Sequence, residues 1–200
     1  MYDLTKRDLI PAAEAMVNAF AHDPLWIHFF SGVPVKNRLA SFTVPLKFCQ
    51  TYGGVYAPSE ELEGVCAWTE GREAGYTLWR MIRSGSIPSA LAMGMELANR
   101  MKPLFDVSSS DMKQNMGDRD FIYLQLLGVT RENQGKGLGG AMLQSLIEKS
   151  DREGRPLYLE TETEENVEWY GKRGFRVVNK VFLEPGSLPF WEMVRENRDS

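Results

Sequence analysis

The sequence contains few of the side chains that hold metal ions or form disulfides. Its 200 residues include only two cysteines and two histidines. Cys49 and Cys66 lie in apolar surroundings, and neither belongs to a CxxC or Cys/His spacing. Metal sites need such spacings, whereas isolated cysteines among apolar residues are typical of reduced proteins. We therefore expect no bound metal, and a cytoplasmic protein.

Long runs of one kind of residue are also missing. No stretch of five or more Lys and Arg occurs, and 27 acidic against 23 basic residues give a net charge of −4. A nucleic-acid partner is therefore not expected. No stretch reaches the roughly 18 apolar residues that a membrane helix needs. The first ten residues, MYDLTKRDLI, lack the apolar core of a signal peptide. We expect neither a membrane partner nor export.

The chain does contain enough apolar sequence for one core. With 43% hydrophobic residues, residues 1–200 are expected to form a single domain. Residues 75–117 differ from the rest because they are rich in methionine and are interrupted by glycine and proline, Pro103 among them. We expect a helical insertion made of broken pieces there. Because methionine suits irregular apolar surfaces, this insertion is either adaptable core packing or the wall of a substrate pocket.

Hydrophobic periodicity and turn residues divide the remaining chain into short helices and strands. The periodicity predicts helices at about 8–21, 35–51, 138–152 and 166–173, with a loop or short helix at the aromatic cluster 26–30. Strands are predicted at 2–4, 55–57, 64–69, 121–129, 156–161, 175–183 and 188–195, the last two joined by a turn at 184–187.

One stretch organises the second half of the chain. Residues 129–140 read VTRENQGKGLGG, between an apolar run and an amphipathic segment. This order predicts a strand, a glycine-rich turn and a helix. Such a turn presents unpaired backbone N–H groups at a helix N-terminus, where the helix dipole is worth about half a positive charge. Phosphate is the ligand that this geometry favours.

Two phosphate-binding patterns can be compared with the loop directly. A P-loop needs GxxxxGK followed by Ser or Thr, and that pattern is missing. The dinucleotide pattern GxGxxG is present as Gly135, Gly137 and Gly140, and Glu160 lies about where a ribose-binding acid is expected. A dinucleotide fold, however, builds several parallel units around this motif, and only one crossover follows it here. The dinucleotide interpretation remains open.

A third pattern accounts for more residues. The segment 134–139, QGKGLG, resembles the Q/R-x-x-G-x-G/A pyrophosphate motif of the GNAT superfamily of acyl-CoA-dependent N-acyltransferases. Asn166, Tyr170, Gly174 and Phe175 resemble the NxxxYxxxGF segment of the same family. The similarity extends over about 123–183. The chain resembles the puromycin N-acetyltransferase branch in particular. The residues that carry this resemblance are LGV before the loop, QGKGLG within it and LET at 159–161.

This resemblance implies a fold, a cofactor and a set of contacts. The implied fold is α/β (α+β), with a central twisted sheet of six to seven mostly antiparallel strands, a splayed parallel pair at the cofactor site, and flanking helices. The implied co-substrate is acetyl-CoA or coenzyme A, with no metal. The cofactor contacts would be Leu127, Val129, Gln134, Gly135, Lys136, Gly137, Leu138, Gly139, Gly140, Thr161, Asn166 and Tyr170.

Acyl transfer to an amine needs a base for the nitrogen and an acid for the leaving thiolate. Tyr170, four residues after Asn166 on one helix face, is the predicted general acid. Alternation along the strand places residues 123, 125, 127 and 129 on one face. Many family members carry Glu or His near position 125, but Gln125 cannot take a proton and is predicted to contact substrate or water. Glu162 is the favoured base, with Glu160, Tyr123 or a water relay as alternatives.

The resulting hypothesis is an N-acetyltransferase that moves an acetyl group from acetyl-CoA directly to the primary amine of a small molecule. The protein would be a monomer or a homodimer, and no sequence feature identifies the acceptor. Two other classes stay open. A non-catalytic acyl-CoA-binding sensor would keep the loop without the proton-transfer groups, and a dinucleotide-binding oxidoreductase domain would use the same glycines differently.

Overall fold

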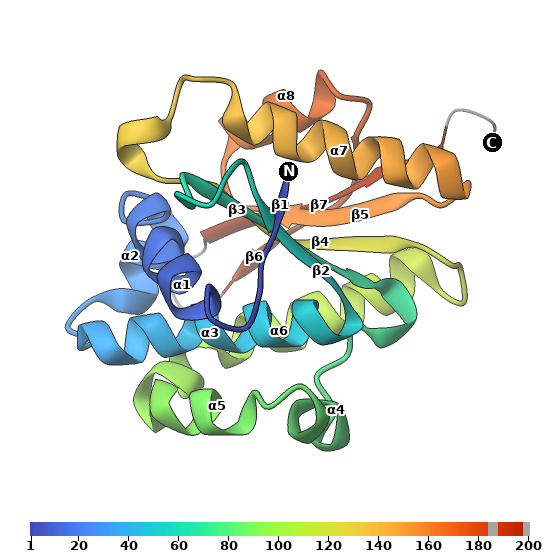
Figure 1. Ribbon diagram of the computed structural model, residues 1–200. Coiled ribbons are helices and arrows are strands. Elements are labelled where there is room, and N and C mark those ends of the chain that lie inside the picture. Colours follow the sequence, from blue (N-terminus) through green and yellow to red (C-terminus); the bar gives the residue numbers. More distant parts are fainter. Residues whose placement is uncertain (184–187, 198–200) are drawn as a thin grey trace.

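A single twisted sheet forms the centre of the molecule (Figure 1). The computed structural model describes residues 1–183 and 188–197, and seven strands in these ranges follow the order β1-β2-β3-β4-β5-β7-β6. All neighbouring strands are antiparallel except β4 and β5, which are parallel. The strands are β1 Tyr2–Asp3, β2 Gly53–Ala57, β3 Gly64–Glu70, β4 Ile122–Val129, β5 Leu157–Thr161, β6 Arg176–Leu183 and β7 Leu188–Arg195. The predicted fold class is confirmed.

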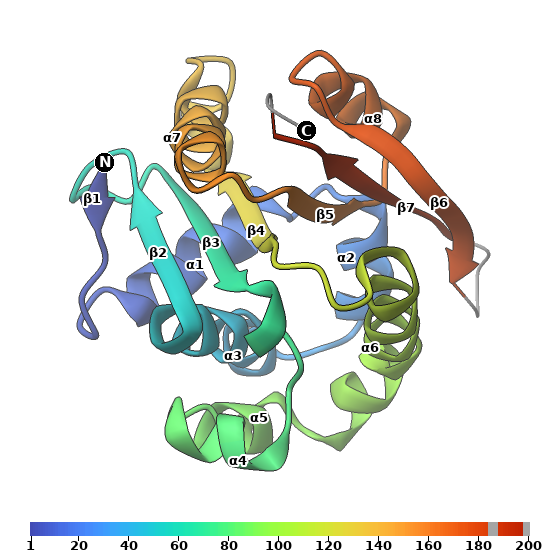
Figure 2. The same cartoon turned by 90° about the vertical axis from the view of Figure 1, so that its right-hand side faces the viewer.

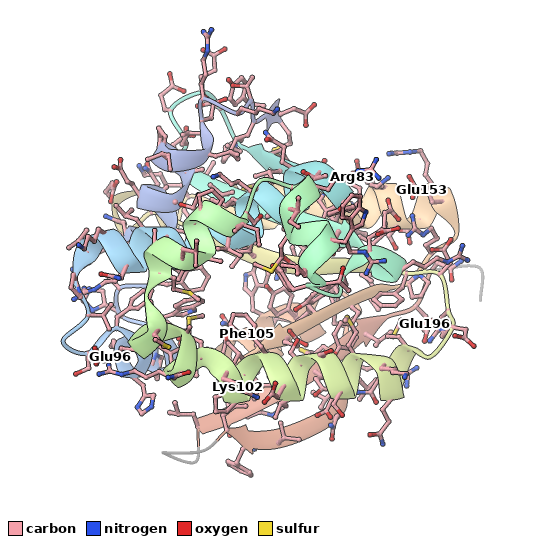
Figure 3. The ribbon with its side chains drawn as sticks, turned by 90° about the horizontal axis from the view of Figure 1, so that it is seen from below. Arg83, Glu96, Lys102, Phe105, Glu153 and Glu196 are labelled. Carbon is pink, nitrogen blue, oxygen red and sulfur yellow. The ribbon has the colours of Figure 1, made fainter. Side chains whose placement is uncertain are left out.

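Helices cover both faces of this sheet. The helices are α1 Leu9–Ala19, α2 Pro24–Phe30, α3 Val35–Tyr52, α4 Leu78–Arg83, α5 Ile87–Met93, α6 Met95–Met116, α7 Leu138–Glu153 and α8 Glu164–Gly171. Figure 2 shows α7 and α8 on one face and α1, α3 and α6 on the other, with α4 and α5 on the far side of α3. Seen from below, α6 lies along β6 (Figure 3). Within the described ranges, no helix is both long and apolar enough to cross a membrane.

Several predicted boundaries need correction. The last helix begins at Glu164, two residues before the predicted start, because the Thr163 hydroxyl caps it by accepting a hydrogen bond from the Asn166 N–H at 3.2 Å. The aromatic cluster at 26–30, predicted as a loop or a short helix, is the short helix α2, which the Asp23 carboxylate caps by accepting from the Leu25 and Trp26 N–H groups. Pro103 does not break its segment, because α6 continues through it. The predicted turn at 184–187 lies outside the described residues.

The parallel pair β4 and β5 separates along its length. Only three residues of each strand pair, Ile122–Leu124 with Leu157–Leu159. Beyond Leu124 the two strands diverge, so one edge of the second half of β4 has no neighbouring strand in the part of the chain that is described. The predicted splay is therefore observed, and it opens on the side where α7 begins.

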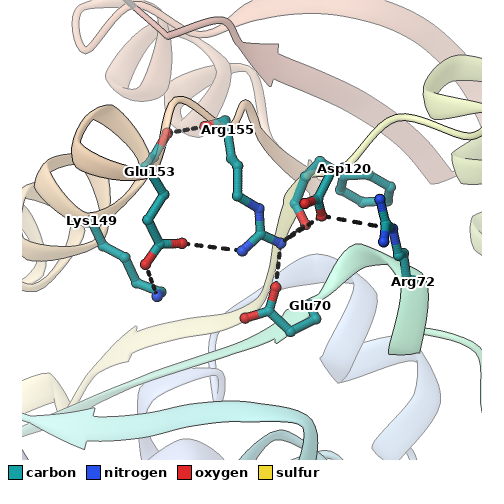
Figure 4. Close-up of polar contacts among 8 residues, drawn as sticks. Glu70, Arg72, Asp120, Lys149, Glu153 and Arg155 are labelled. Atoms are coloured by element: carbon teal, nitrogen blue, oxygen red, sulfur yellow. Dashed lines mark hydrogen bonds and ion pairs between the residues drawn. The ribbon is translucent and has the colours of Figure 1, made fainter.

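An ion-pair cluster holds the closed end of this pair together (Figure 4). Arg155, just before β5, binds Asp120 at 3.0 Å, Glu153 at 3.1 Å and also Glu70. Its guanidinium donates a further hydrogen bond to the Phe121 carbonyl at 2.8 Å. These contacts join the start of β4, the end of β3 and the end of α7. The strands are thus fixed at one end and free to diverge at the other.

A β-bulge interrupts β4 where the divergence begins. Ala67 pairs with Leu126, and its neighbour Trp68 pairs with Leu124, so Gln125 is an extra residue opposite β3. A bulge of this kind changes which side chains face which side of the sheet. The regular alternation assumed from the sequence therefore fails at this position.

Candidate active site

The glycine-rich turn forms an uncapped helix N-terminus. Gly135 and Gly137 have φ values of +75° and +79°, and Gly137 is the N-cap of α7 with no side-chain cap. A Cβ added at either glycine would meet no atom within 4 Å. The positive φ, rather than crowding, is thus what favours glycine at both positions. The turn leaves the first N–H groups of α7 available to an anion.

The polar side chains of the turn are occupied within the turn itself. Gln134 donates from Nε2 to the Val129 carbonyl at 3.2 Å, and Lys136 donates from Nζ to Oδ1 of Asn133 at 2.7 Å. Each of these side chains keeps further N–H groups, so the helix end presents backbone donors with two polar side chains beside them. Cofactor contacts of Gln134 and Lys136 stay predictions.

One cation beside this helix end was missed by the sequence reasoning. The Arg173 guanidinium stacks on the Trp169 ring at 3.7 Å, and its Nη1 donates to the Trp169 carbonyl at 2.7 Å. Its Nη2 is 3.4 Å from where a Cβ of Gly140 would lie. The only sequence signal for this placement is the four-residue spacing between an aromatic residue and an arginine on one helix.

A cavity of about 470 Å³ opens where β4 and β5 diverge. Five residues from the predicted site line it: Leu127 of β4, Thr161 and Glu162 at the end of β5, and Asn166 and Tyr170 of α8. The structure therefore brings these five predicted site residues together. Val129 and the predicted contacts from Gln134 to Gly140 are not among the lining residues of this cavity.

Glu162 is a half-buried carboxylate and not part of a solvated loop. Among the described residues, no side chain hydrogen-bonds or ion-pairs with its oxygens, and the one donor near them is its own backbone N–H. Burial raises its pKa well above the usual 4.5, and the neighbouring charges of Asp23 and Glu160 raise it further. A carboxylate with a raised pKa and no side-chain partner of this kind is suited to accept a proton.

Glu160 lies in the same cavity but is held by hydrogen bonds. It accepts from Ser108 Oγ at 2.6 Å, from the Tyr123 hydroxyl at 2.5 Å and from the Tyr158 hydroxyl at 3.4 Å. Burial raises its pKa, while these donors act in the opposite direction. With three donors on its two oxygens, Glu160 is fixed in position and less available than Glu162.

Tyr170 presents a buried phenol to the cavity. Its side chain is 8% exposed, and its ring packs edge-on against Trp169 and Phe175, with centroids 4.9 and 5.5 Å away. No described residue hydrogen-bonds its hydroxyl. Burial raises the pKa of Tyr170 above its usual value, and Cys66 and Glu162 add to the effect. The phenol therefore stays protonated at neutral pH and can donate.

The prediction that one face of β4 carries residues 123, 125, 127 and 129 is wrong. Tyr123 and Gln125 face the side of α3 and α6, whereas Leu127 and Val129 pack with the α7 side. The cause is the bulge, which places Gln125 and Leu126 on the same side in succession.

At this position only one of the two polar atoms of the Gln125 side chain has hydrogen-bond partners among the described residues. Its Oε1 accepts hydrogen bonds from the Tyr76 hydroxyl at 2.8 Å and from Cys49 Sγ at 3.2 Å. Its Nε2 is buried and has no hydrogen-bond partner among the described residues. Since Gln125 lines the cavity, this amide is a donor available to a bound molecule.

The helical insertion supplies the opposite wall. Four of its methionines, Met81, Met93, Met101 and Met112, line the cavity. Tyr76 lines it too, and the sequence reasoning missed that residue because its partner Gln125 lies 49 positions away. Within the described chain, no three His, Cys, Asp or Glu side chains gather as a metal site requires.

Comparison with known proteins agrees with this geometry. Residues 107–196 match the acetyltransferase (GNAT) domain family. A curated relative, an uncharacterized N-acetyltransferase of Schizosaccharomyces pombe, is 23% identical over 199 residues, covering 95% of this chain and 80% of the relative. The second half of the chain is therefore similar to GNAT acetyltransferase domains, and the sheet and the glycine turn agree with this similarity. The puromycin N-acetyltransferase branch is not confirmed.

Two solved structures share the fold over nearly the whole chain. One, from Corynebacterium glutamicum, is described as histone acetyltransferase HPA2 and related acetyltransferase; it has a TM-score of 0.66 and 16% identity, covering 98% of this chain and 94% of that chain. The other is a polyamine N-acetyltransferase of Drosophila melanogaster, with a TM-score of 0.63 and 10% identity, covering 98% of each chain. At these identities the likeness concerns the fold alone.

Proposed function

We propose that this protein is an N-acetyltransferase that transfers an acetyl group from acetyl-CoA directly to a primary amine of a small molecule. The observation that carries the proposal is the cavity at the splay of β4 and β5, where Tyr170 and Glu162 meet. An uncapped α7 N-terminus lies beyond the splayed end of β4. A loop for phosphate and a pair of proton-transfer groups thus lie at the same end of the sheet.

The residues present fit coenzyme A as a co-substrate. The backbone turn of Gly135 and Gly137, with positive φ and open space around it, suits the pyrophosphate. The edge of β4 from Gln125 to Val129 has no partner strand on the β5 side within the described residues, and it suits the amides of an extended arm. Bound there, acetyl-CoA would supply the acetyl group as a thioester.

Two residues carry the proton transfers. Glu162 accepts a proton from the nitrogen as the N–C bond forms, because no side chain among the described residues holds its oxygens and its pKa is raised. Tyr170 donates a proton to the sulfur as the C–S bond breaks. The Nε2 of Gln125 is available to hydrogen-bond the acceptor. No covalent acyl-enzyme is needed, since amine and thioester meet in one cavity.

The first test combines binding with turnover. Isothermal titration should show binding of acetyl-CoA, and an amine panel should show acetylated product. Tyr170→Phe should lower kcat by about tenfold or more with little change in acetyl-CoA affinity, as loss of a general acid does. Tyr52→Phe is the matched control, because its hydroxyl donates to the Arg80 carbonyl at 3.4 Å and Tyr52 does not line the cavity.

Each alternative gives a different result. Acetyl-CoA binding without any turnover would indicate a sensor, and tight NADH binding without CoA binding would indicate a dinucleotide domain. An unchanged kcat in Tyr170→Phe would remove Tyr170 from the proton transfer while leaving the activity itself in place.

A further inference from the structure

The cavity is charged only near the β5 end. Its ionisable acidic or basic residues, among those described, are Glu160 and Glu162, both on or next to β5. Most other lining residues are apolar or aromatic, and many of these come from α2 to α6. Figure 2 shows α4 and α5 on the side of α3 away from α7 and α8. The cavity therefore has a carboxylate end at the splayed strands and an apolar lobe toward the helical insertion.

Only one of the two carboxylates is free to pair with a cation. Glu160 already accepts hydrogen bonds from Ser108, Tyr123 and Tyr158. Glu162 accepts none from any other described residue, only one from its own backbone N–H. A single ammonium group thus has a single unpaired carboxylate to meet. A second ammonium in the lobe would be a buried charge without a partner, which proteins disfavour strongly.

The walls of the lobe favour an apolar body of adjustable shape. Met81, Met93 and Met101 line it from three different helices. Methionine side chains are flexible and adapt to irregular apolar surfaces. Phe105 of α6 also lines it, and its ring lies 6.3 Å from that of Tyr76. In Figure 3 Phe105 lies on the side of α6 that faces the rest of the molecule.

We propose that the acceptor is a monoamine with an apolar aryl or alkyl body, held by its amine at Glu162 and by its body in the lobe lined by the helical insertion. This inference rests on the proposed function and adds the substrate class to it. The specificity of the enzyme then resides in α4, α5 and α6, while β4, β5 and α8 hold the reacting groups.

A substrate panel tests the class directly. Phenethylamine and hexylamine should be acetylated with kcat/KM values about tenfold or more above those of putrescine, agmatine and spermidine, because a pocket rejects an unmatched buried charge by at least that factor. Equal or higher values for the diamines would overturn this inference while leaving the proposed function intact. Absence of acetylation for every amine, with acetyl-CoA bound, would overturn both.

A charge placed in the lobe should reverse this order. Phe105→Glu supplies a second carboxylate at a position that is 43% exposed and so tolerates the change. It should lower kcat/KM for hexylamine and raise it for putrescine, changing their ratio by about tenfold or more. Ser110→Glu is the matched control, since Ser110 lies on the exposed surface of the same helix outside the lining. An unchanged ratio in folded Phe105→Glu would overturn the placement of the amine's body.

Filling part of the lobe with a larger side chain provides an independent test of the proposal. Ala90→Leu adds bulk to the lining of the lobe, whereas Ala92→Leu adds the same bulk on the exposed face of the same helix. Only Ala90→Leu should lower kcat/KM for phenethylamine relative to ethylamine, which does not reach the lobe. Equal losses for both amines, or none for either, would contradict the proposed lobe.

Discussion

At the scale of single residues, hydrogen bonding separates two neighbouring carboxylates into different roles. Burial raises the pKa of both Glu160 and Glu162. Three side-chain donors fix the oxygens of Glu160, while those of Glu162 have no side-chain donor among the described residues. Only Glu162 can change its protonation state without breaking a network. The pH dependence of the reaction should therefore follow Glu162.

Replacing Glu162 tests this assignment. The wild-type kcat/KM should fall as pH decreases through the pKa of Glu162, which lies well above 4.5, because a protonated carboxyl cannot act as a base. Glu162→Gln should lower kcat/KM by roughly a hundredfold or more and remove this acidic limb, as loss of a general base does. Glu164→Gln, an exposed carboxylate on α8, should change neither. If kcat/KM of Glu162→Gln still fell at acidic pH as in the wild type, a group other than Glu162 would be responsible for the fall.

The sequence identified some of these residues and not others for a physical reason. Tyr170 and Asn166 are four apart on one helix, so local periodicity alone places them on one face. Ser108 hydrogen-bonds Glu160, which lies 52 positions away in the sequence. Tyr76 hydrogen-bonds Gln125, which lies 49 positions away. Such contacts depend on how helices pack against the sheet, and no short-range pattern encodes that packing.

At the scale of elements, the glycine turn and helix α7 were predictable because their cause is local. Gly137 and Gly154 begin and end α7 with φ values of +79° and +64°, and both act as left-handed caps. The bulge at Gln125 was not predictable, since it arises from the register of β4 against β3. That register shift explains why a face inferred by simple alternation was wrong beyond Gln125.

The two caps of α7 give a matched pair of variants. Gly137→Ala and Gly154→Ala each force alanine into a left-handed conformation at a cost of about 1 kcal/mol, so both should lower Tm to a similar extent. Only Gly137→Ala lies in the anion turn, and it should weaken CoA binding by about tenfold, or 1.4 kcal/mol. Titration calorimetry with CoA measures the difference. Equal CoA affinities in the two variants would show that the turn does not bind the pyrophosphate.

At the scale of the whole molecule, strand order is the feature that the sequence left undetermined. The last strand, β7, inserts between β5 and β6, and the pairing of β5 with β7 joins residues 30 to 38 positions apart. The strands themselves were predicted from alternation and β-forming residues. Their order depends on long-range pairing, as does the position of the helical insertion opposite α8.

This strand order creates a polar cluster in the interior. Glu192, in the middle of β7, is fully buried and pairs across the ladder with Glu160. Its Oε2 accepts a hydrogen bond from Asn115 of α6, while its Oε1 has no donor among the described residues. Burial, followed by the nearby carboxylate of Asp111, raises the pKa of Glu192 to about 8. The folded state therefore favours the protonated, neutral form of this side chain.

A raised pKa in the folded state has a definite consequence for stability. Glu192 contributes stability fully below its unfolded pKa of 4.5, and that contribution is lost as pH rises through about 8, where the buried group must ionise. Glu192→Gln, which mimics the neutral form and offers an amide N–H toward Asp111, should lose less Tm than the wild type when pH is raised from about 5 to about 9, since Glu160 and Glu162 keep their raised pKa values. The wild-type Tm should fall over the same interval, by about 2–4 °C for each kcal/mol lost. Glu60→Gln, at an exposed loop carboxylate, should follow the wild type. Parallel Tm curves for all three proteins would show that ionisation of Glu192 is not linked to folding.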